Sequence, residues 1–90
     1  MSSDNVSIEE KQIIDNFITL ADSEIGKSYK IISVSAGHNL IARLNAMGLA
    51  PGEVFNVISH YPKGPATIAV KGSRFAIGRG MAEKIIISEQ

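Results

Sequence analysis

The 90-residue sequence predicts a small, mainly β protein, an antiparallel barrel of about five strands with one internal amphipathic helix and an N-terminal helical extension. Three observations predict this class. Short runs rich in β-branched residues, separated by Gly and Pro, fill the chain after residue 26. One segment whose apolar residues have helical spacing interrupts these runs. Five short strands are too few for two stacked sheets, whereas a strongly bent barrel closes most of its edges around one core.

Composition limits the chain to one domain and excludes several classes of function. With 90 residues and 44% hydrophobic content, the chain can bury one core but not two. It has no cysteine, which fits a reducing compartment and excludes zinc fingers, iron–sulfur clusters and thiol chemistry. The start is polar, and no apolar run approaches the ~20 residues needed to cross a bilayer. We therefore expect a cytoplasmic protein that is not inserted in the membrane.

The N-terminal segment is acidic and has the pattern of a short helix. Residues 1–25 carry six acidic residues against one lysine, a net charge of −5, which the remaining residues balance with +5. Ser7 and Glu10 have the spacing of a capping box. The apolar residues Ile13, Ile14, Phe17, Ile18 and Ala21 then share one helical face. We expect an acidic helical extension over residues 1–18 and a barrel domain over 19–90. The apolar face would pack on the barrel or on a second copy of the chain, and the second arrangement would make a homodimer.

Five β-strands are predicted in the rest of the chain. They are Tyr29–Val34, Val54–Tyr61, Ala66–Val70, Arg74–Ile77 and Lys84–Ser88. Pro62–Pro65 and Lys71–Ser73 have the residues of turns between neighbouring strands. Gly78–Gly80 is also interpreted as a turn between two strands.

The helix and the corner that follows it are the most strongly specified local structure. Leu40, Ile41, Leu44 and Met47 recur at helical spacing within a helix predicted over His38–Met47. Gly48 then suits the left-handed residue after the helix, which places Leu49 against Leu44 as in a Schellman motif. Pro51 and Gly52 end the helix and turn the chain into the next strand.

No constellation of residues predicts catalysis or a bound cofactor. His38 and His60 lie far apart in the sequence and lack the spacing of metal ligands, so no metal site is assigned. Neither a nucleophile elbow nor a glycine-rich nucleotide loop is present. Basic residues could gather on one face, but few aromatic residues are available to stack on bases. We therefore predict neither an enzyme nor a nucleic-acid-binding protein, and no cofactor.

The segment Arg43–Gly52, RLNAMGLAPG, resembles the RL-x-x-MGL-x-PG signature of the ferrous iron transport protein A (FeoA) family. Other elements follow in the family's order, from Leu20 and Gly26 to the segment 82–87, so the resemblance covers about residues 19–88. It implies an SH3-like barrel without catalytic residues. It also implies a cytoplasmic accessory protein of the membrane ferrous iron transporter FeoB, whose cytoplasmic side carries a GTP-binding domain.

Two functions remain open from the sequence. The first is a docking module that binds the FeoB-type transporter and modulates its assembly or its GTPase and transport cycle. Its partner-binding residues would be Leu40, Arg43, Leu44, Met47, Gly48, Leu49, Pro51 and Gly52. Leu44 and Met47 can instead be core residues of the barrel, and the core is the favoured place for Leu44. The alternative is a small SH3-like, metal-responsive regulatory domain that binds a divalent transition metal or an acidic peptide.

Overall fold

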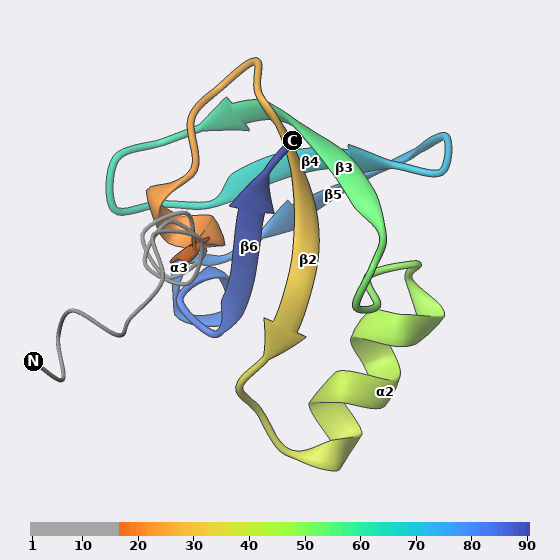
Figure 1. Ribbon diagram of the computed structural model, residues 1–90. Coiled ribbons are helices and arrows are strands. Elements are labelled where there is room, and N and C mark those ends of the chain that lie inside the picture. The colour runs from red at the N-terminus through yellow and green to blue at the C-terminus, as the bar shows by residue number, and fades with distance from the viewer. Residues whose placement is uncertain (1–16) are drawn as a thin grey trace, which may run out of the picture.

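The structure is a computed structural model that describes residues 17–90. Its strands are β1 (Phe17–Thr19), β2 (Ser28–Val34), β3 (Val54–His60), β4 (Ala66–Val70), β5 (Ser73–Ile77) and β6 (Ile85–Glu89). Its helical elements are the 3₁₀ turn η2 (Leu20–Asp22), the helix α2 (His38–Ala46) and the short helix α3 (Arg79–Ala82). All six strands form one antiparallel sheet in the order β1-β6-β2-β3-β4-β5 (Figure 1).

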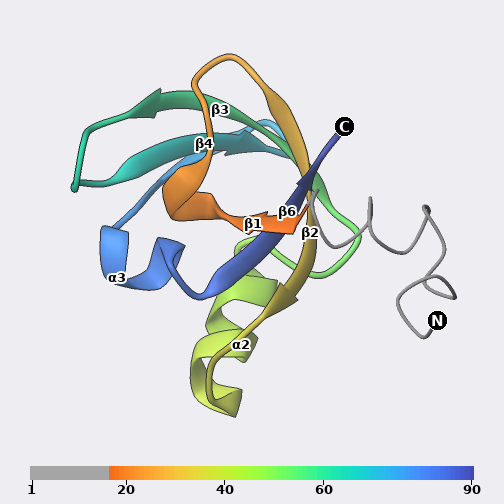
Figure 2. The same cartoon turned by 60° about the vertical axis from the view of Figure 1, so that its left-hand side comes forward.

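The sheet is strongly bent, so that β3, β4 and β5 cross over β1, β6 and β2 (Figure 2). Register shifts between Ile31 and Ser33 and between Val57 and Ser59 interrupt two of the ladders. Such bulges bend a strand and increase its twist, which lets a single sheet curl around one core. Within residues 17–90, no ladder joins the edge strands β1 and β5, so the predicted closure of the barrel is not observed.

The five predicted strands are confirmed, but the start of the domain differs from the prediction. The helix expected through Ala21 is wrong over its last residues, because Phe17–Thr19 is a sixth strand and Leu20–Asp22 is a 3₁₀ turn. In β1, Ile18 is in register with Ile87, and the following Leu20 is fully buried. Tertiary packing therefore overrides the local helical pattern here. The earlier part of the predicted extension lies outside the described residues.

The predicted turn at Gly78–Gly80 is also wrong in detail. Gly78 is the N-cap residue of α3, and its carbonyl accepts a hydrogen bond from the Ala82 amide at 2.8 Å. This short helix buries the Ala82 side chain in the core before the chain enters β6.

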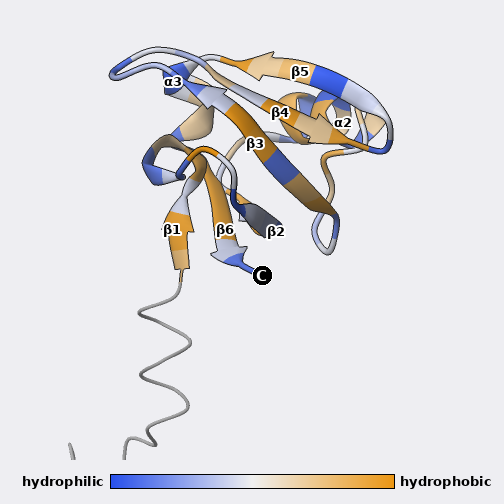
Figure 3. Cartoon of the chain, turned by 90° about the horizontal axis from the view of Figure 1, so that it is seen from above, coloured by the Kyte–Doolittle hydropathy of each residue, from blue (hydrophilic) through white to orange (hydrophobic). Residues whose placement is uncertain are grey.

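The core lies inside the bend and is built from alternating strand residues. Along β3, exposed and buried residues alternate from Val54 to Ile58, so one set of side chains points inward and the other outward. Figure 3 colours β3 hydrophobic on both sides of a hydrophilic position, so apolar residues also lie on its outer side. At its centre the rings of Tyr29 and Phe55 stack with centroids 6.0 Å apart. From outside the sheet, η2 contributes Leu20 and α2 contributes Leu44 to the same cluster. No helix among residues 17–90 has the length and apolarity that a membrane span requires.

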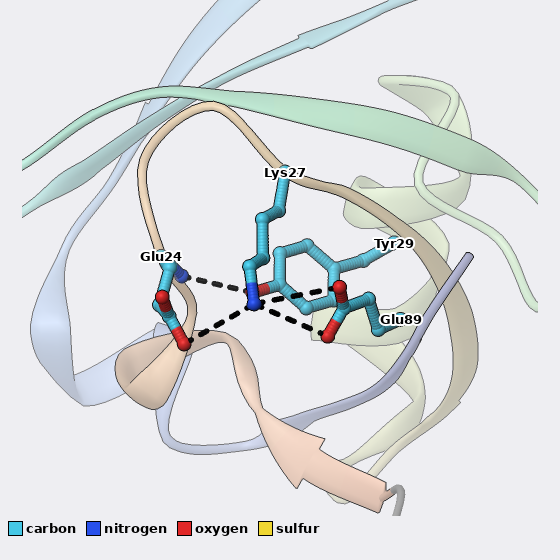
Figure 4. A network of polar contacts seen from close by, with 4 residues as sticks. All are labelled: Glu24, Lys27, Tyr29 and Glu89. Carbon is cyan, nitrogen blue, oxygen red and sulfur yellow. Dashed lines mark hydrogen bonds and ion pairs between the residues drawn. The ribbon is translucent and has the colours of Figure 1, made fainter.

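Tyr29 also holds the turn that leads into β2. Its hydroxyl accepts a hydrogen bond from the backbone amide of Glu24 at 2.9 Å (Figure 4). The Lys27 ammonium lies 3.4 Å from carboxylate oxygens of both Glu24 and Glu89. These carboxylates, Glu24 first, raise the pKa of Lys27 above its ordinary value. Because the ion pairs face solvent, they contribute little to the free energy of unfolding. The turn is therefore held mainly by Tyr29, whose ring is buried and whose hydroxyl accepts the hydrogen bond from Glu24.

Tyr29→Phe should lower the free energy of unfolding by about 0.5–1.5 kcal/mol, because the part-buried Glu24 amide loses its acceptor. Urea unfolding followed by circular dichroism measures this change. The matched control is Tyr61→Phe, which removes a hydroxyl from a side chain that is 65% exposed. The control should change stability by less than about 0.5 kcal/mol. Equal effects of the two substitutions would contradict the assigned role of the Tyr29 hydroxyl.

Candidate docking surface

The end of α2 is a Schellman motif, as the sequence predicted. Gly48 has a φ of +91°, and its amide donates to the Asn45 carbonyl at 3.0 Å. The Leu49 amide donates to the Leu44 carbonyl at 2.8 Å, which satisfies a second carbonyl of the last turn. Leu44 and Leu49 are both buried in the core cluster. The helix end is therefore fixed by hydrogen bonds and by two buried side chains.

A tight turn follows at once and attaches the corner to the sheet. The Glu53 amide donates to the Ala50 carbonyl at 3.0 Å, with Pro51 and a left-handed Gly52 (φ +96°) between them. Proline followed by a left-handed glycine is typical of a type II turn. The Gly52 amide donates to the Ile31 carbonyl at 2.8 Å, and the Ile31 amide donates to the Glu53 carbonyl at 2.9 Å. The corner therefore continues the β2–β3 ladder and cannot swing freely.

The eight predicted partner-binding residues divide into three groups by exposure. Leu44 and Leu49 are buried and can only support the surface from below. The half-buried residues are Leu40, Met47 and Gly48. Arg43, Pro51 and Gly52 are exposed. The part of this set that a partner can contact directly therefore consists of the three exposed residues and the outer edges of the three half-buried ones. We call these six residues the docking surface.

Two residues beside the docking surface were missed by the sequence reasoning. The Lys71 ammonium lies 2.9 Å from a carboxylate oxygen of Glu53. The Lys71 side chain also passes over Gly48, where a Cβ atom would come within 3.5 Å of its Cδ. The β4–β5 turn therefore reaches the corner and flanks it with an ion pair. No local pattern signals this contact, because it depends on how the sheet bends.

Arg43 is the charged member of the docking surface. It lies in the last turn of α2, where a cation is favoured by the partial negative charge of the helix end. Its side chain forms no ion pair with any residue in 17–90. The guanidinium is therefore available for a charge-assisted hydrogen bond to an acidic partner.

The two histidines are not brought together. His38 is exposed at the start of α2, whereas His60 is half-buried at the end of β3. Within the described part of the chain, no three His, Cys, Asp or Glu side chains gather as metal ligands would. The corner after α2 therefore presents a rigid, partly apolar surface with one exposed cation, Arg43.

The structure is a small all-β domain with one main helix, and the corner after that helix is rigid and partly exposed. The chain belongs to the FeoA family: the FeoA domain matches residues 18–89, and the family consists of non-catalytic accessory proteins of ferrous iron transport. The chain is 37% identical over 70 residues to a putative Fe(2+) transport protein A of Methanocaldococcus jannaschii. That alignment covers 78% of this chain and 84% of the relative.

Solved structures agree with this assignment. The fold is similar to the crystal structure of an iron uptake regulatory protein (FeoA), with a TM-score of 0.77 and 34% identity over 82% of this chain and 99% of the other. It is also similar to the solution structure of FeoA from Chlorobium tepidum, with a TM-score of 0.72 and 26% identity over 80% of this chain and 70% of the other. A manganese-dependent transcriptional repressor matches with a TM-score of 0.74 at 14% identity, over 82% of this chain and 42% of its own. This last similarity shows a shared fold alone.

Gly48→Ala should destabilise the protein by about 1–2 kcal/mol, because alanine must adopt a left-handed conformation there. The 3.5 Å approach of Lys71 is an ordinary contact, so the backbone carries the cost. Chemical denaturation gives the difference in free energy. Gly80→Ala is the control, because this exposed glycine lies within α3, has no positive φ, and leaves open space within 4 Å of where a Cβ atom would stand. It should be neutral or stabilising by up to about 1 kcal/mol, and a loss equal to that of Gly48→Ala would refute the argument.

Proposed function

We propose that this chain is a cytoplasmic, non-catalytic docking module that binds the cytoplasmic side of a FeoB-type ferrous iron transporter. By binding, it modulates the assembly of the transporter or its GTPase and transport cycle. Membership of the FeoA family supports the link to ferrous iron transport. The docking surface would supply the contact.

The observation that carries the proposal is the rigid corner between α2 and β3. Pro51 is exposed at its tip, and Arg43 is exposed one helical turn before the end of α2. Hydrogen bonds to Ile31 and the buried Leu44 and Leu49 hold both in place. A surface that is ordered before binding loses little conformational entropy on association, so even a few contacts can give useful affinity.

Binding to the soluble GTP-binding domain of a cognate transporter, with and without GTP, tests the proposal. Amide chemical shifts of the isotope-labelled protein should change over residues 40–52 when the domain is added. Changes confined to other strands, with residues 40–52 unaffected, would refute the docking surface while leaving transporter binding intact. If the domain causes no change in any amide, the proposed partner itself is wrong for this part of the transporter.

Arg43→Glu should weaken this binding about tenfold or more, because it places a negative charge against the acidic partner group. Isothermal titration calorimetry measures the dissociation constant of each variant. Lys63→Glu is the matched control, since Lys63 is an exposed cation in the β3–β4 turn, at the opposite end of β3 from the corner. The control makes the same charge change but should bind like the unaltered protein. An equal loss in both variants would indicate general electrostatics rather than a contact at Arg43.

A further inference from the structure

The outer face of the sheet carries an apolar and basic strip that no described element covers. Register places Phe17, Ser88, Lys30 and Val54 side by side across β1, β6, β2 and β3. Their strand neighbours Ile18, Ile87, Tyr29 and Phe55 point to the core or pack against it. Because successive side chains along a strand point to opposite faces, the four residues in register share the outer face of the sheet. They are Phe17, Ser88, Lys30 and Val54. We call these four residues the outer row.

Exposed apolar side chains lie in the outer row and beside it. Phe17 is 39% exposed and Val54 is 47% exposed, and Ile58 on the same face of β3 is 40% exposed. Ile86, in register with Thr19, adds a half-buried aliphatic side chain beside the row. Large apolar side chains gathered on one face of a small protein are typical of a contact surface.

The charge on this face has one sign. Lys30 belongs to the outer row. Arg74 belongs to the adjacent row through Asn56 and Ala69, but its strand β5 lies across the bend of the sheet from β2 (Figure 2). Neither cation forms an ion pair with a residue in 17–90. Glu89 is the only acidic residue in the described strands, and it is in register with the inward-facing Tyr29. The outer face is therefore complementary to an acidic segment that also carries aliphatic side chains.

The chain itself contains such a segment directly before Phe17. Residues 1–16 have four acidic residues against one lysine, a net charge of −3. The same sixteen residues include the aliphatic residues Val6, Ile8, Ile13 and Ile14. The segment joins the sheet at Phe17, which is itself a member of the outer row.

The segment is long enough to reach across the outer row. Along the sheet, three strand spacings separate Phe17 from Val54, about 14 Å. Sixteen residues span about 24 Å as a helix and about 53 Å when extended. Covalent attachment also raises the local concentration of the segment far above that of a separate molecule.

We propose that residues 1–16 bind across the outer face of their own sheet and cover the outer row. The acidic side chains meet Lys30, and the aliphatic side chains cover Val54 and Phe17. This contact lies on the sheet rather than on the corner after α2, and it does not depend on the proposed transporter partner. It makes the outer face a surface that another molecule can reach only by displacing the segment.

A nitroxide spin label on the full chain tests the proposal. The sequence has no cysteine, so Ser7→Cys creates a single labelling site. Paramagnetic broadening should be strong at the amides of Lys30, Val54 and Asn56 and absent at Arg43 on α2. Broadening confined to the amides next to Phe17, or equal on α2 and on the outer face, would overturn the proposal.

Two further measurements separate the explanations. In a mixture of spin-labelled chains without nitrogen-15 and unlabelled chains with nitrogen-15, broadening at Val54 would show that a second copy supplies the segment and would overturn binding within one chain.

In the spin-labelled chain, Lys30→Glu should abolish most of the broadening at Val54 and Asn56. Arg43→Glu makes the same charge change away from the outer face and should leave the broadening unchanged. An equal loss in both variants would also overturn the proposal.

Discussion

The two left-handed glycines at the corner after α2 are the constraint on which the rest of the structure depends. Gly48 ends the helix and Gly52 turns the chain, so that the polypeptide reverses direction within five residues. The hydrogen bonds of Gly52 and Glu53 with Ile31 then set where β3 begins beside β2. That register determines which residues of β3 enter the core. It also brings Phe55 onto Tyr29, and Tyr29 in turn holds the turn before β2.

The parts of the fold that the sequence predicted correctly are those with local signals. Leu44, Gly48 and Leu49 specify the Schellman motif by residue type and spacing, and the structure contains each expected hydrogen bond. The five β-branched runs are strands for the same reason. Phe17–Ala21 was assigned wrongly because its apolar residues satisfy a helical period equally well. Pairing with β6, more than sixty residues away along the chain, decides the outcome, and no local window contains that information.

In the candidate site, too, the sequence predicted what local signals specify and missed what depends on long-range packing. Periodicity placed Leu44 on the apolar face of the helix and Arg43 off it, and the structure agrees. It could not show how much of Leu40 and Met47 stays accessible, because that depends on how α2 lies against the sheet. The ion pair of Lys71 with Glu53 and the composition of the outer row depend on strand order and register. Strand order here is not sequential, since β6 lies between β1 and β2. Without knowledge of the strand order, the sequence predicts neither the ion pair of Lys71 with Glu53 nor the outer row.

The position of β6 has a consequence for how the molecule is made. β6 follows every other strand in the chain, yet it supplies the neighbour that both β1 and β2 require. During synthesis, β1 therefore leaves the ribosome before its partner in the sheet exists, and β2 keeps one unpaired edge while β3, β4 and β5 are added. Pairing across such a long separation must overcome the loop-closure entropy before it gains contacts. The sheet is thus completed in one late step, and a chain interrupted before residue 85 lacks an interior strand rather than an edge.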